Sequence, residues 1–260
     1  MITHRQLMAT MFAVLFGITP AIAAAQANPK PLVIFATASL SGTLDEAAAT
    51  WAKETGKPAP RISYGPSNSL ARRIQQNARA DVFLSADLAS MDGLQSRNLI
   101  KWATRVNLLV NRIALIAPSD STATVTLAPT LDLSAAIGQG RIAIANVEAV
   151  QAGKHGKAAL QKLGAWTKVQ DKIVQTHTVR EAVLLVSRGE VPLGIVTTAD
   201  AAADPKVKVL ATLPDAAYPA IVHPIAVLRN STNRDAEQFL IYLRSAGSVI
   251  AFEKQGFTVQ

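Results

Sequence analysis

The sequence predicts an α/β protein with two lobes, in which each lobe is a mostly parallel sheet flanked by helices. From Pro31 onward, short apolar runs rich in β-branched residues alternate with amphipathic stretches, the pattern of a parallel sheet covered by helices. The alternation comes in two blocks. Two long apolar segments, Arg105 to Pro118 and Ala220 to Leu228, join these blocks, and we expect them to be paired hinge strands.

Each element follows from its local pattern. The runs expected to form strands are Leu32 to Ala36, Arg61 to Tyr64, Asp81 to Leu84, Arg141 to Ala145, Lys172 to Thr176 and Leu193 to Val196. The amphipathic stretches expected to form helices are Leu40 to Glu54, Ser69 to Asn77, Leu88 to Ser96, Gly153 to Leu163 and Arg180 to Arg188. The tail from Asn233 to Gln260 is expected to be helical as well.

The helical tail suggests that both ends of the chain build the same lobe. We therefore expect residues 30–110 and 224–260 to form the first lobe, and residues 111–223 to form the second. A cleft between two such lobes, with two strands as its hinge, is a common site for ligands.

Residues 1–25 have the pattern of a secretory signal peptide. Arg5 precedes an uncharged apolar run from Leu7 to Ile22, and small residues follow it, so we expect cleavage near Ala25. Gly17 and Pro20 interrupt the run and no basic stop-transfer residues follow, which makes a retained membrane anchor the weaker interpretation. The protein is therefore expected in the periplasm.

Composition narrows the function further. The sequence has no cysteine, which excludes disulfides, cysteine chemistry and a lipidated cysteine. The leader contains one of the 26 basic residues and none of the 18 acidic ones, so the exported chain carries a net charge of +7 and favours anionic partners. Nucleic acid is not expected, because the basic residues are scattered and aromatic residues make up only 5% of the chain.

The most informative residues lie in turns that follow predicted strands and open predicted helices. These turns are Ala36 to Gly42, Gly65 to Leu70, Val150 to Gly153 and Thr178 to Arg180. A helix start exposes unpaired N–H groups at the positive end of the helix dipole, so several starts around one cleft would bind an anion without charged side chains. For any one of Ser39, Ser67 and Thr178, simple helix capping is the alternative.

Several segments together resemble the periplasmic molybdate-binding proteins of ABC transporters. They are ATASLSG, SNSLARRI with ADVFLSAD, VQAGKHGKAALQKLGAW, TVREAVLLV, PLGIVTTAD and the ending GFTVQ, in the order and spacing of that family. The similarity runs from about Pro31 to Gln260. It implies the two-lobe periplasmic binding protein fold, with the lobes joined by two hinge strands. It also implies a non-enzymatic solute-binding protein that captures molybdate or tungstate between its lobes and delivers it to a membrane permease and its ATPase.

The resemblance also implies the binding residues. By motif, the oxyanion ligands become Ser39, Ser67, Ala152 and Val179, which would hold its oxygens without any direct protein–metal bond. The family commonly has a Tyr after the GIV strand, where this sequence has the shorter Thr197, so that contact is open. No cofactor is implied, and we expect a monomer.

Other chemistries have weaker support in the sequence. Gly153 to Lys157 lacks the GxxxxGK[ST] spacing of a phosphate loop. His155, His177 and His223 lack the spacing of a zinc site. Two alternatives stay open: a site for sulfate or phosphate, and a periplasmic enzyme that uses Ser39. The second would require a base within hydrogen-bond reach of the serine.

Overall fold

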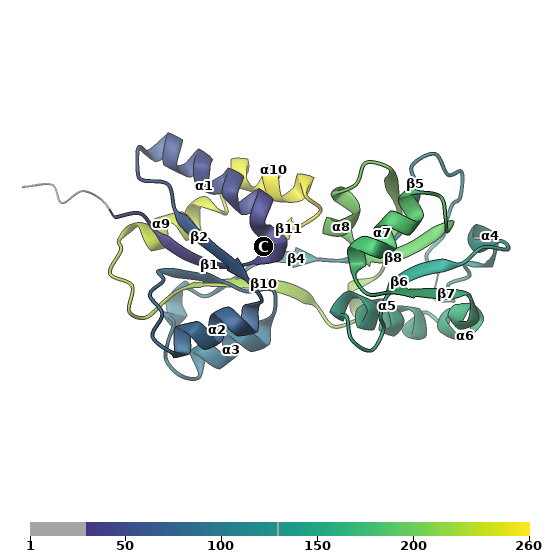
Figure 1. Ribbon diagram of the computed structural model, residues 1–260, viewed down its shortest axis with the longest axis horizontal. Coiled ribbons are helices and arrows are strands. Elements are labelled where there is room, and N and C mark those ends of the chain that lie inside the picture. The colour runs from purple at the N-terminus through teal and green to yellow at the C-terminus, as the bar shows by residue number, and fades with distance from the viewer. Residues whose placement is uncertain (1–29, 129) are drawn as a thin grey trace, which may run out of the picture.

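The computed structural model describes residues 30–128 and 130–260, which form two sheets with helices on their faces (Figure 1). The predicted signal peptide lies outside the described residues. We call the six-stranded sheet and its helices the first lobe, and the five-stranded sheet and its helices the second lobe. The strand orders are β11-β4-β10-β3-β1-β2 in the first lobe and β7-β6-β8-β5-β9 in the second.

The strand bounds place both ends of the described chain in the first lobe. Its strands are β1 (Val33–Thr37), β2 (Arg61–Gly65), β3 (Val82–Leu84), β4 (Val106–Asn111), β10 (Ile221–Val227) and β11 (Thr258–Val259). The strands of the second lobe are β5 (Ile113–Pro118), β6 (Ile142–Ala145), β7 (Ile173–Thr176), β8 (Leu193–Thr197) and β9 (Val207–Thr212).

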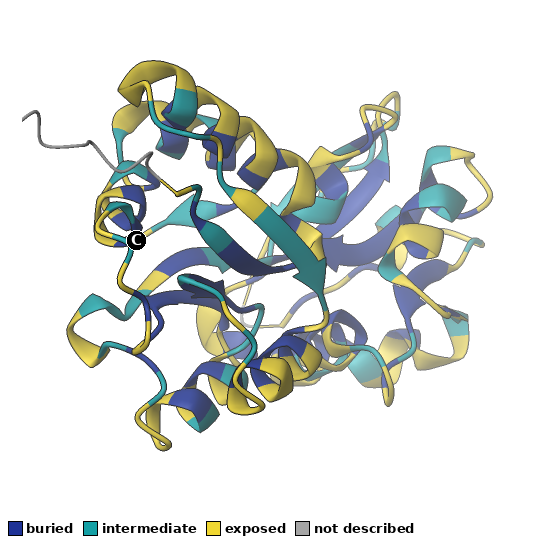
Figure 2. Cartoon of the chain, turned by 60° about the vertical axis from the view of Figure 1, so that its left-hand side comes forward, coloured by how far each residue is buried: buried dark blue, intermediate teal, exposed yellow. Residues whose placement is uncertain are grey.

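Helices cover both faces of each sheet, and their outer surfaces are exposed while the strands are largely buried (Figure 2). The first lobe has η1 (Ala38–Leu40), α1 (Ser41–Thr55), α2 (Ser67–Gln75), α3 (Leu88–Gln95), η2 (Trp102–Thr104), α9 (Asp235–Tyr242) and α10 (Ala246–Lys254). The second has α4 (Ser134–Ile137), α5 (Gln151–Lys162), α6 (Trp166–Val169), η3 (Gln170–Lys172), α7 (Val179–Ser187), α8 (Thr198–Ala202) and η4 (Asp215–Ala217). No described helix is long and apolar enough to cross a membrane.

Each lobe has its own hydrophobic core on each face of its sheet. In the first lobe, Trp51 and Phe239 pack edge to face at 5.4 Å on one face, while Phe83 and Met91 are buried on the other. In the second lobe, two further clusters pack beneath α5 and beneath α7. Each cluster draws its residues from one lobe, with two exceptions beside the hinge: Ile221 of β10 belongs to the cluster beneath α5, and Ala199 of α8 packs against the cluster of Trp51. A relative motion of the lobes therefore disturbs the cores only beside the hinge.

The strand directions show which edges of the two sheets face each other. β3 and β4 are both antiparallel to β10, so β4 runs parallel to β3 and to its parallel neighbours β1 and β2. The chain passes from the carboxyl end of β4 into the second lobe. β5 then enters the second lobe antiparallel to β8, with Ile113 opposite Thr197. The carboxyl ends of β1–β3 and of β6–β8 therefore lie on the facing edges, where α/β sheets usually bind ligands.

Two contacts join the segment that passes from β4 to β5 and the segment that returns from β9 to β10. Arg112 separates β4 from β5 and forms an ion pair with Asp215, with Nε 3.1 Å from Oδ1. The N–H of Ile113 donates to the Tyr218 hydroxyl at 3.0 Å. The outgoing and returning chains are thus tied directly to each other.

The sequence predicted the two-lobe α/β fold correctly, and the strands and helices expected before residue 233 end within two residues of observed ones. The tail from Asn233 is helical in α9 and α10, as expected, but it ends in the strand β11, which pairs with β4. Each sheet has more antiparallel pairs than expected, because β10 in the first lobe and β5 in the second run antiparallel to their neighbours. One expectation was wrong in detail. Ala220 to Leu228 does not cross between the lobes, since β10 lies wholly in the first sheet. The chain returns to the first lobe between β9 and β10, in a segment that contains Pro214, and proline does not favour a continuing strand.

Candidate functional site

Ser39 lies at the carboxyl edge of the first sheet, in the short helix η1 that follows β1. Its side chain is exposed, and its oxygen lies 3.4 Å from the hydroxyl oxygen of the buried Thr37. Among the described residues this is the one hydrogen bond of the Ser39 hydroxyl, and no base contacts it. The serine does not cap α1, whose N-cap residue is Leu40. Its hydroxyl is therefore free for a ligand at this edge.

Ser67 lies beside Ser39 because β2 pairs with β1, with Thr37 opposite Gly65. Ser67 is the first residue of α2, and its buried hydroxyl oxygen accepts a hydrogen bond of 2.8 Å from the N–H of Ala86. Ala86 follows β3, on the other side of β1, so this bond spans the end of β1 where Ser39 lies. The bond occupies an acceptor position of Ser67 and leaves its proton available to a ligand.

Tyr64 fixes the start of α1 against the end of β2. Its hydroxyl lies 2.7 Å from Oδ1 of Asp45 and 3.1 Å from the carbonyl oxygen of Ser41. Burial raises the pKa of Tyr64, and the hydrogen bond and negative charge of Asp45 raise it further. Tyr64 therefore stays protonated and connects β2, which precedes Ser67, to α1, which follows Ser39.

Three helix starts present free backbone donors at the facing edges. The first hydrogen bonds within these helices run from Leu70 N to Pro66 O in α2, from Lys154 N to Val150 O in α5, and from Ala182 N to Thr178 O in α7. The N–H groups that precede these bonds have no intrahelical partner. Those of Ala152 and Val179 belong to this set, so both residues can donate from the backbone whatever their side chains are.

Close packing sets the position of the α5 start. A Cβ atom added at Gly153 would lie 2.2 Å from the carbonyl oxygen of Ala145 and 2.6 Å from that of Asn146. Only glycine allows this approach, which brings the first turn of α5 down onto the end of β6. Ala152 is buried in the core cluster beneath α5, and Val179 packs against the same cluster. The two residues therefore lie at the same edge of the second sheet, where the paired strands β6 and β7 end.

Thr178 and Thr197 use their hydroxyls to cap helices. Thr178 accepts from the N–H of Glu181 at 3.2 Å at the start of α7. Thr197 accepts from the N–H of Asp200 at 3.1 Å and donates its proton to Oδ2 of Asp200 at 2.5 Å. Capping is thus the role of Thr178, and the Thr197 proton already has a protein acceptor. For Ser39 and Ser67 the capping alternative does not hold, since neither forms a capping hydrogen bond.

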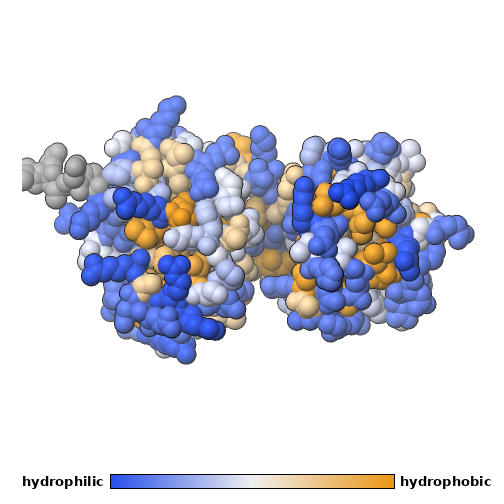
Figure 3. Space-filling view, viewed as in Figure 1, coloured by the Kyte–Doolittle hydropathy of each residue, from blue (hydrophilic) through white to orange (hydrophobic). Residues whose placement is uncertain are grey.

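The structure brings Ser39 and Ser67 together on the first lobe, and Ala152 and Val179 together on the second. Across the lobes, no hydrogen bond joins these two pairs in the described part of the chain. The molecular surface is indented between the lobes on the face shown in Figure 3. The four predicted residues therefore lie at facing edges of two separate lobes.

Other residues considered for chemistry have structural roles. Lys157 forms an ion pair with Glu148 at 2.6 Å, as expected for a lysine on a helix surface. Asp87 caps α3 by accepting from the N–H of Ser90. His155 and His223 are buried in different lobes. Within residues 30–128 and 130–260, no group of three His, Cys, Asp or Glu side chains could hold a metal ion.

Sequence reasoning missed two contributors to this edge, Ala86 and Thr37. Ala86 is separated from Ser67 by 19 positions, and its role depends on a backbone N–H. Thr37 contributes a buried hydroxyl beside Ser39. Thr37 could have been noticed as a polar residue at the end of an apolar strand. No local sequence signal identifies Ala86.

The chain matches the family model of bacterial extracellular solute-binding proteins over residues 32–258. It is 36% identical over 237 residues to the molybdate-binding protein ModA of Escherichia coli strain K12, an alignment that covers 91% of this chain and 92% of the relative. It is 33% identical over 230 residues to YvgL of Bacillus subtilis strain 168, assigned as an ABC transporter substrate-binding lipoprotein, with coverage of 88% and 86%.

A solved structure is similar along almost its whole length. It is a substrate-binding domain assigned to a molybdenum ABC transporter of Clostridium difficile, with a TM-score of 0.81 and 28% sequence identity. The match covers 88% of this chain and 98% of that domain. Both lobes and their connections are therefore present in that structure.

Proposed function

This chain belongs to the bacterial extracellular solute-binding proteins, and from that premise we propose that it binds molybdate or tungstate between its lobes for an ABC importer. As a solute-binding protein it is a component of transport and not an enzyme. The observation that carries the proposal is the arrangement of uncharged donors on two facing sheet edges. The similarity to molybdate-binding relatives supports the same ligand.

In the proposed complex, Ser39 and Ser67 donate from the first lobe, and the N–H groups of Ala152 and Val179 donate from the second. A tetrahedral dianion has acceptor oxygens in all directions, so it can accept from both lobes at once. Helix dipoles at α2, α5 and α7 add a favourable potential for negative charge. Free, aligned donors of this kind bind an anion without a charged side chain and without a metal–protein bond.

The proposed binding favours closure of the lobes. An anion that contacts both lobes only when they approach stabilises the closed form by the difference between its affinities for the two forms. The moving bodies are proposed as residues 30–110 with 224–260, and residues 111–223. The cores of the lobes, which meet only beside the hinge, and the single residue between β4 and β5 support a hinge at this place.

The finer assignments of location and partners are part of the same proposal. The chain is exported, its leader is removed near Ala25, and the monomer delivers its anion to a permease driven by an ATPase. The match to an extracellular solute-binding family supports export. The relatives assigned to molybdate and molybdenum transport support the importer.

Calorimetric titration with molybdate, tungstate, sulfate and phosphate tests the ligand. Donors alone favour a fully deprotonated dianion, because a protonated oxygen would meet a donor where it needs an acceptor. Phosphate should therefore bind at least tenfold more weakly than molybdate near neutral pH, and the smaller sulfate should fall short of several donors. Equal affinity for phosphate and molybdate would refute a donor-only site and favour the sulfate or phosphate alternative.

A further inference from the structure

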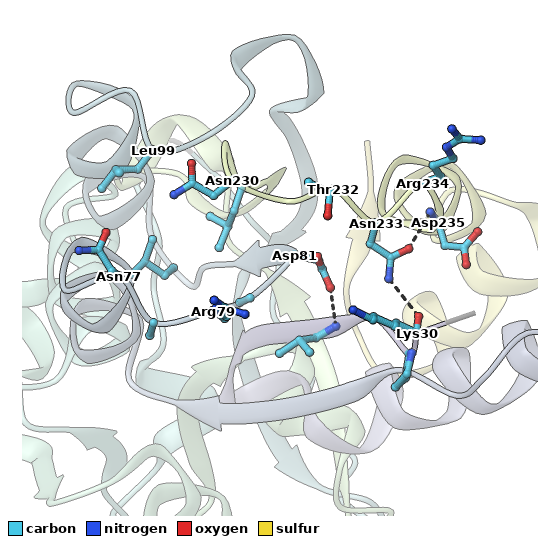
Figure 4. Close-up of a pocket in the computed structure, with 16 residues that line it drawn as sticks. Lys30, Asn77, Arg79, Asp81, Leu99, Asn230, Thr232, Asn233, Arg234 and Asp235 are labelled. Atoms are coloured by element: carbon cyan, nitrogen blue, oxygen red, sulfur yellow. Dashed lines mark hydrogen bonds between the residues drawn. The ribbon is translucent and has the colours of Figure 1, made fainter. Parts of the chain in front are cut away.

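A hollow in the described part of the chain lies in the first lobe, away from the facing edges. It has a volume of about 1060 Å³ and lies at the amino ends of β1 and β3, where Val33 and Asp81 line it (Figure 4). The carboxyl ends of the same strands carry the proposed molybdate site. The hollow is therefore at the opposite pole of the lobe and is not used by the proposed function.

The hollow offers more free donors than free acceptors. Figure 4 shows the side chains of Lys30 and Arg79 directed toward its interior. Among the described residues, neither forms an ion pair, and the Asn77 and Asn230 amides make no hydrogen bond. Such a set of donors favours an anion with several oxygen acceptors.

The acidic groups of the hollow are already engaged by the protein. Oδ2 of Asp81 accepts from the N–H of Val33 at 2.9 Å, and its Oδ1 accepts from the hydroxyl of Ser231 at 2.6 Å. Asp235 forms an ion pair of 2.6 Å with Lys57. Among the described residues, Lys30, Arg79 and Arg234 of the lining form no ion pair, and Asp81 contacts neutral donors only. The unpaired basic side chains of the lining therefore outnumber the unpaired acidic one.

Apolar residues form part of the wall. Ile74 and Leu228 are buried, while Val33 and Leu99 are partly exposed toward the hollow. A wall of this kind does not suit a small hydrated ion by itself. An apolar wall beside free cations suits an amphiphilic anion, whose charged group binds the cations and whose apolar part covers the wall.

The position of Lys30 indicates where such an anion would come from. Lys30 lines the hollow and lies five residues after Ala25, the predicted end of the leader. Even a fully extended chain of five residues spans only about 17 Å. A leader inserted in the membrane would therefore hold this pole near the lipid surface during export. The sequence has no cysteine that could carry a lipid, unlike a lipoprotein.

We propose that this hollow is a contact site for phosphate headgroups of an anionic phospholipid surface. Lys30 and Arg79 bind the headgroup phosphate, the Asn77 and Asn230 amides donate to its remaining oxygens, and the apolar wall contacts the adjoining part of the lipid. This contact would retain the exported protein at the membrane by charge. It is independent of the anion site between the lobes.

Sedimentation with lipid vesicles tests the proposal on the exported protein at low ionic strength. Vesicles containing phosphatidylglycerol should bind the protein, and vesicles of phosphatidylcholine alone should not. The double variant Lys30→Gln, Arg79→Gln should bind about thirtyfold more weakly, since each basic residue near an anionic surface contributes about 1 kcal/mol. Added salt should weaken the wild-type binding.

The matched control is Lys162→Gln, Lys168→Gln, which removes the same charge from exposed positions of the second lobe. It should retain most of the vesicle binding, and both double variants should titrate with molybdate like wild type. Equal binding by the two double variants would overturn the site and leave only a net-charge effect. No binding of wild type to anionic vesicles would also overturn it, as would binding of soluble glycerol phosphate without any binding of vesicles.

Discussion

The two lobes contribute to the proposed anion site in different ways. The first lobe offers serine hydroxyls, and one of them is oriented by a hydrogen bond from another strand end. The second lobe offers backbone N–H groups at the starts of α5 and α7. Substituting a serine deletes its donor directly. A backbone donor is lost only when its helix start is displaced, so its position depends on packing such as that at Gly153.

This difference predicts that a packing change in the second lobe will have a larger effect than loss of either serine. Gly153→Ala places a Cβ where the carbonyl oxygen of Ala145 lies 2.2 Å away, so the first turn of α5 must move. If the displaced turn loses the bond from the Ala152 N–H and also keeps the anion from the Val179 N–H, two charge-assisted hydrogen bonds of about 2 kcal/mol each are lost and molybdate affinity falls about a thousandfold. Calorimetric titration measures this change.

Gly247→Ala is the matched control for that experiment. Gly247 is also in a helix, and an added Cβ would meet nothing within 4 Å. It should bind molybdate like wild type. Wild-type affinity in folded Gly153→Ala would show that the start of α5 is not part of the site.

A buried histidine in the first lobe predicts that the stability of the protein depends on pH. Burial lowers the pKa of His223 on β10 to about 4, although the negative charge of Asp87 opposes this shift. As the pH falls below about 6.5, the unfolded chain takes up a proton that the folded chain refuses until about pH 4. The free energy of unfolding should therefore fall by up to about 3 kcal/mol between pH 7 and pH 4.

His223→Gln should remove that part of the pH dependence, as measured by denaturant unfolding at pH 7 and pH 4.5. The exposed His177→Gln is the matched control and should keep it. His155 is also buried, and its lowered pKa contributes a similar trend in all three proteins. If His223→Gln loses as much stability as wild type on acidification, His223 does not cause the effect.

Within the first lobe, the two serines should differ in their effects. Ser39→Ala and Ser67→Ala should each weaken molybdate binding tenfold or more, because a hydrogen bond to a charged group contributes about 1.5 to 3 kcal/mol. Ser67→Ala should also reduce the free energy of unfolding by about 1 kcal/mol, because the N–H of Ala86 loses its acceptor. Ser39→Ala should leave stability nearly unchanged.

Titration and denaturant unfolding of both variants measure these effects, with Ser67→Thr as a control that keeps a hydroxyl. Equal stability of the two alanine variants would show that the bond from Ala86 does not stabilise this edge. Wild-type affinity in either variant would remove that hydroxyl from the proposed site.

Thr197 should have the smallest effect on binding, although it lies at the same edge of the second lobe. Its proton is donated to Asp200, and the shorter side chain does not reach as far as the Tyr common in the resembling family. Thr197→Val should change molybdate affinity by less than about 1 kcal/mol, while loss of the helix cap lowers stability by about the same amount. Thr197→Ser should keep the cap. A loss of affinity as large as that of Ser39→Ala would place Thr197 among the ligands.

Local patterns in the sequence were sufficient for the fold and for the positions of the candidate residues. Period-2 and helical patterns predicted the elements to within two residues, because those patterns depend on neighbouring residues. The edge strand β9 was missed, because the run Val207–Thr212 is partly exposed and forms a strand by pairing with β5. The returning hinge segment was predicted in the wrong place for a similar reason, because only its pairing with β3 and β4 assigns β10 to the first sheet.

The sequence by itself determined that Ser39, Ser67, Ala152 and Val179 would lie where helices follow strands, since strand ends and helix starts are encoded locally. Only the tertiary structure decided which hydroxyls remain free. Ser67 keeps its proton because Ala86, 19 residues away, donates to its oxygen, whereas Thr197 gives its proton to Asp200. Hydrogen-bond partners depend on which strand ends become neighbours, and that order is set by the packing of the whole sheet.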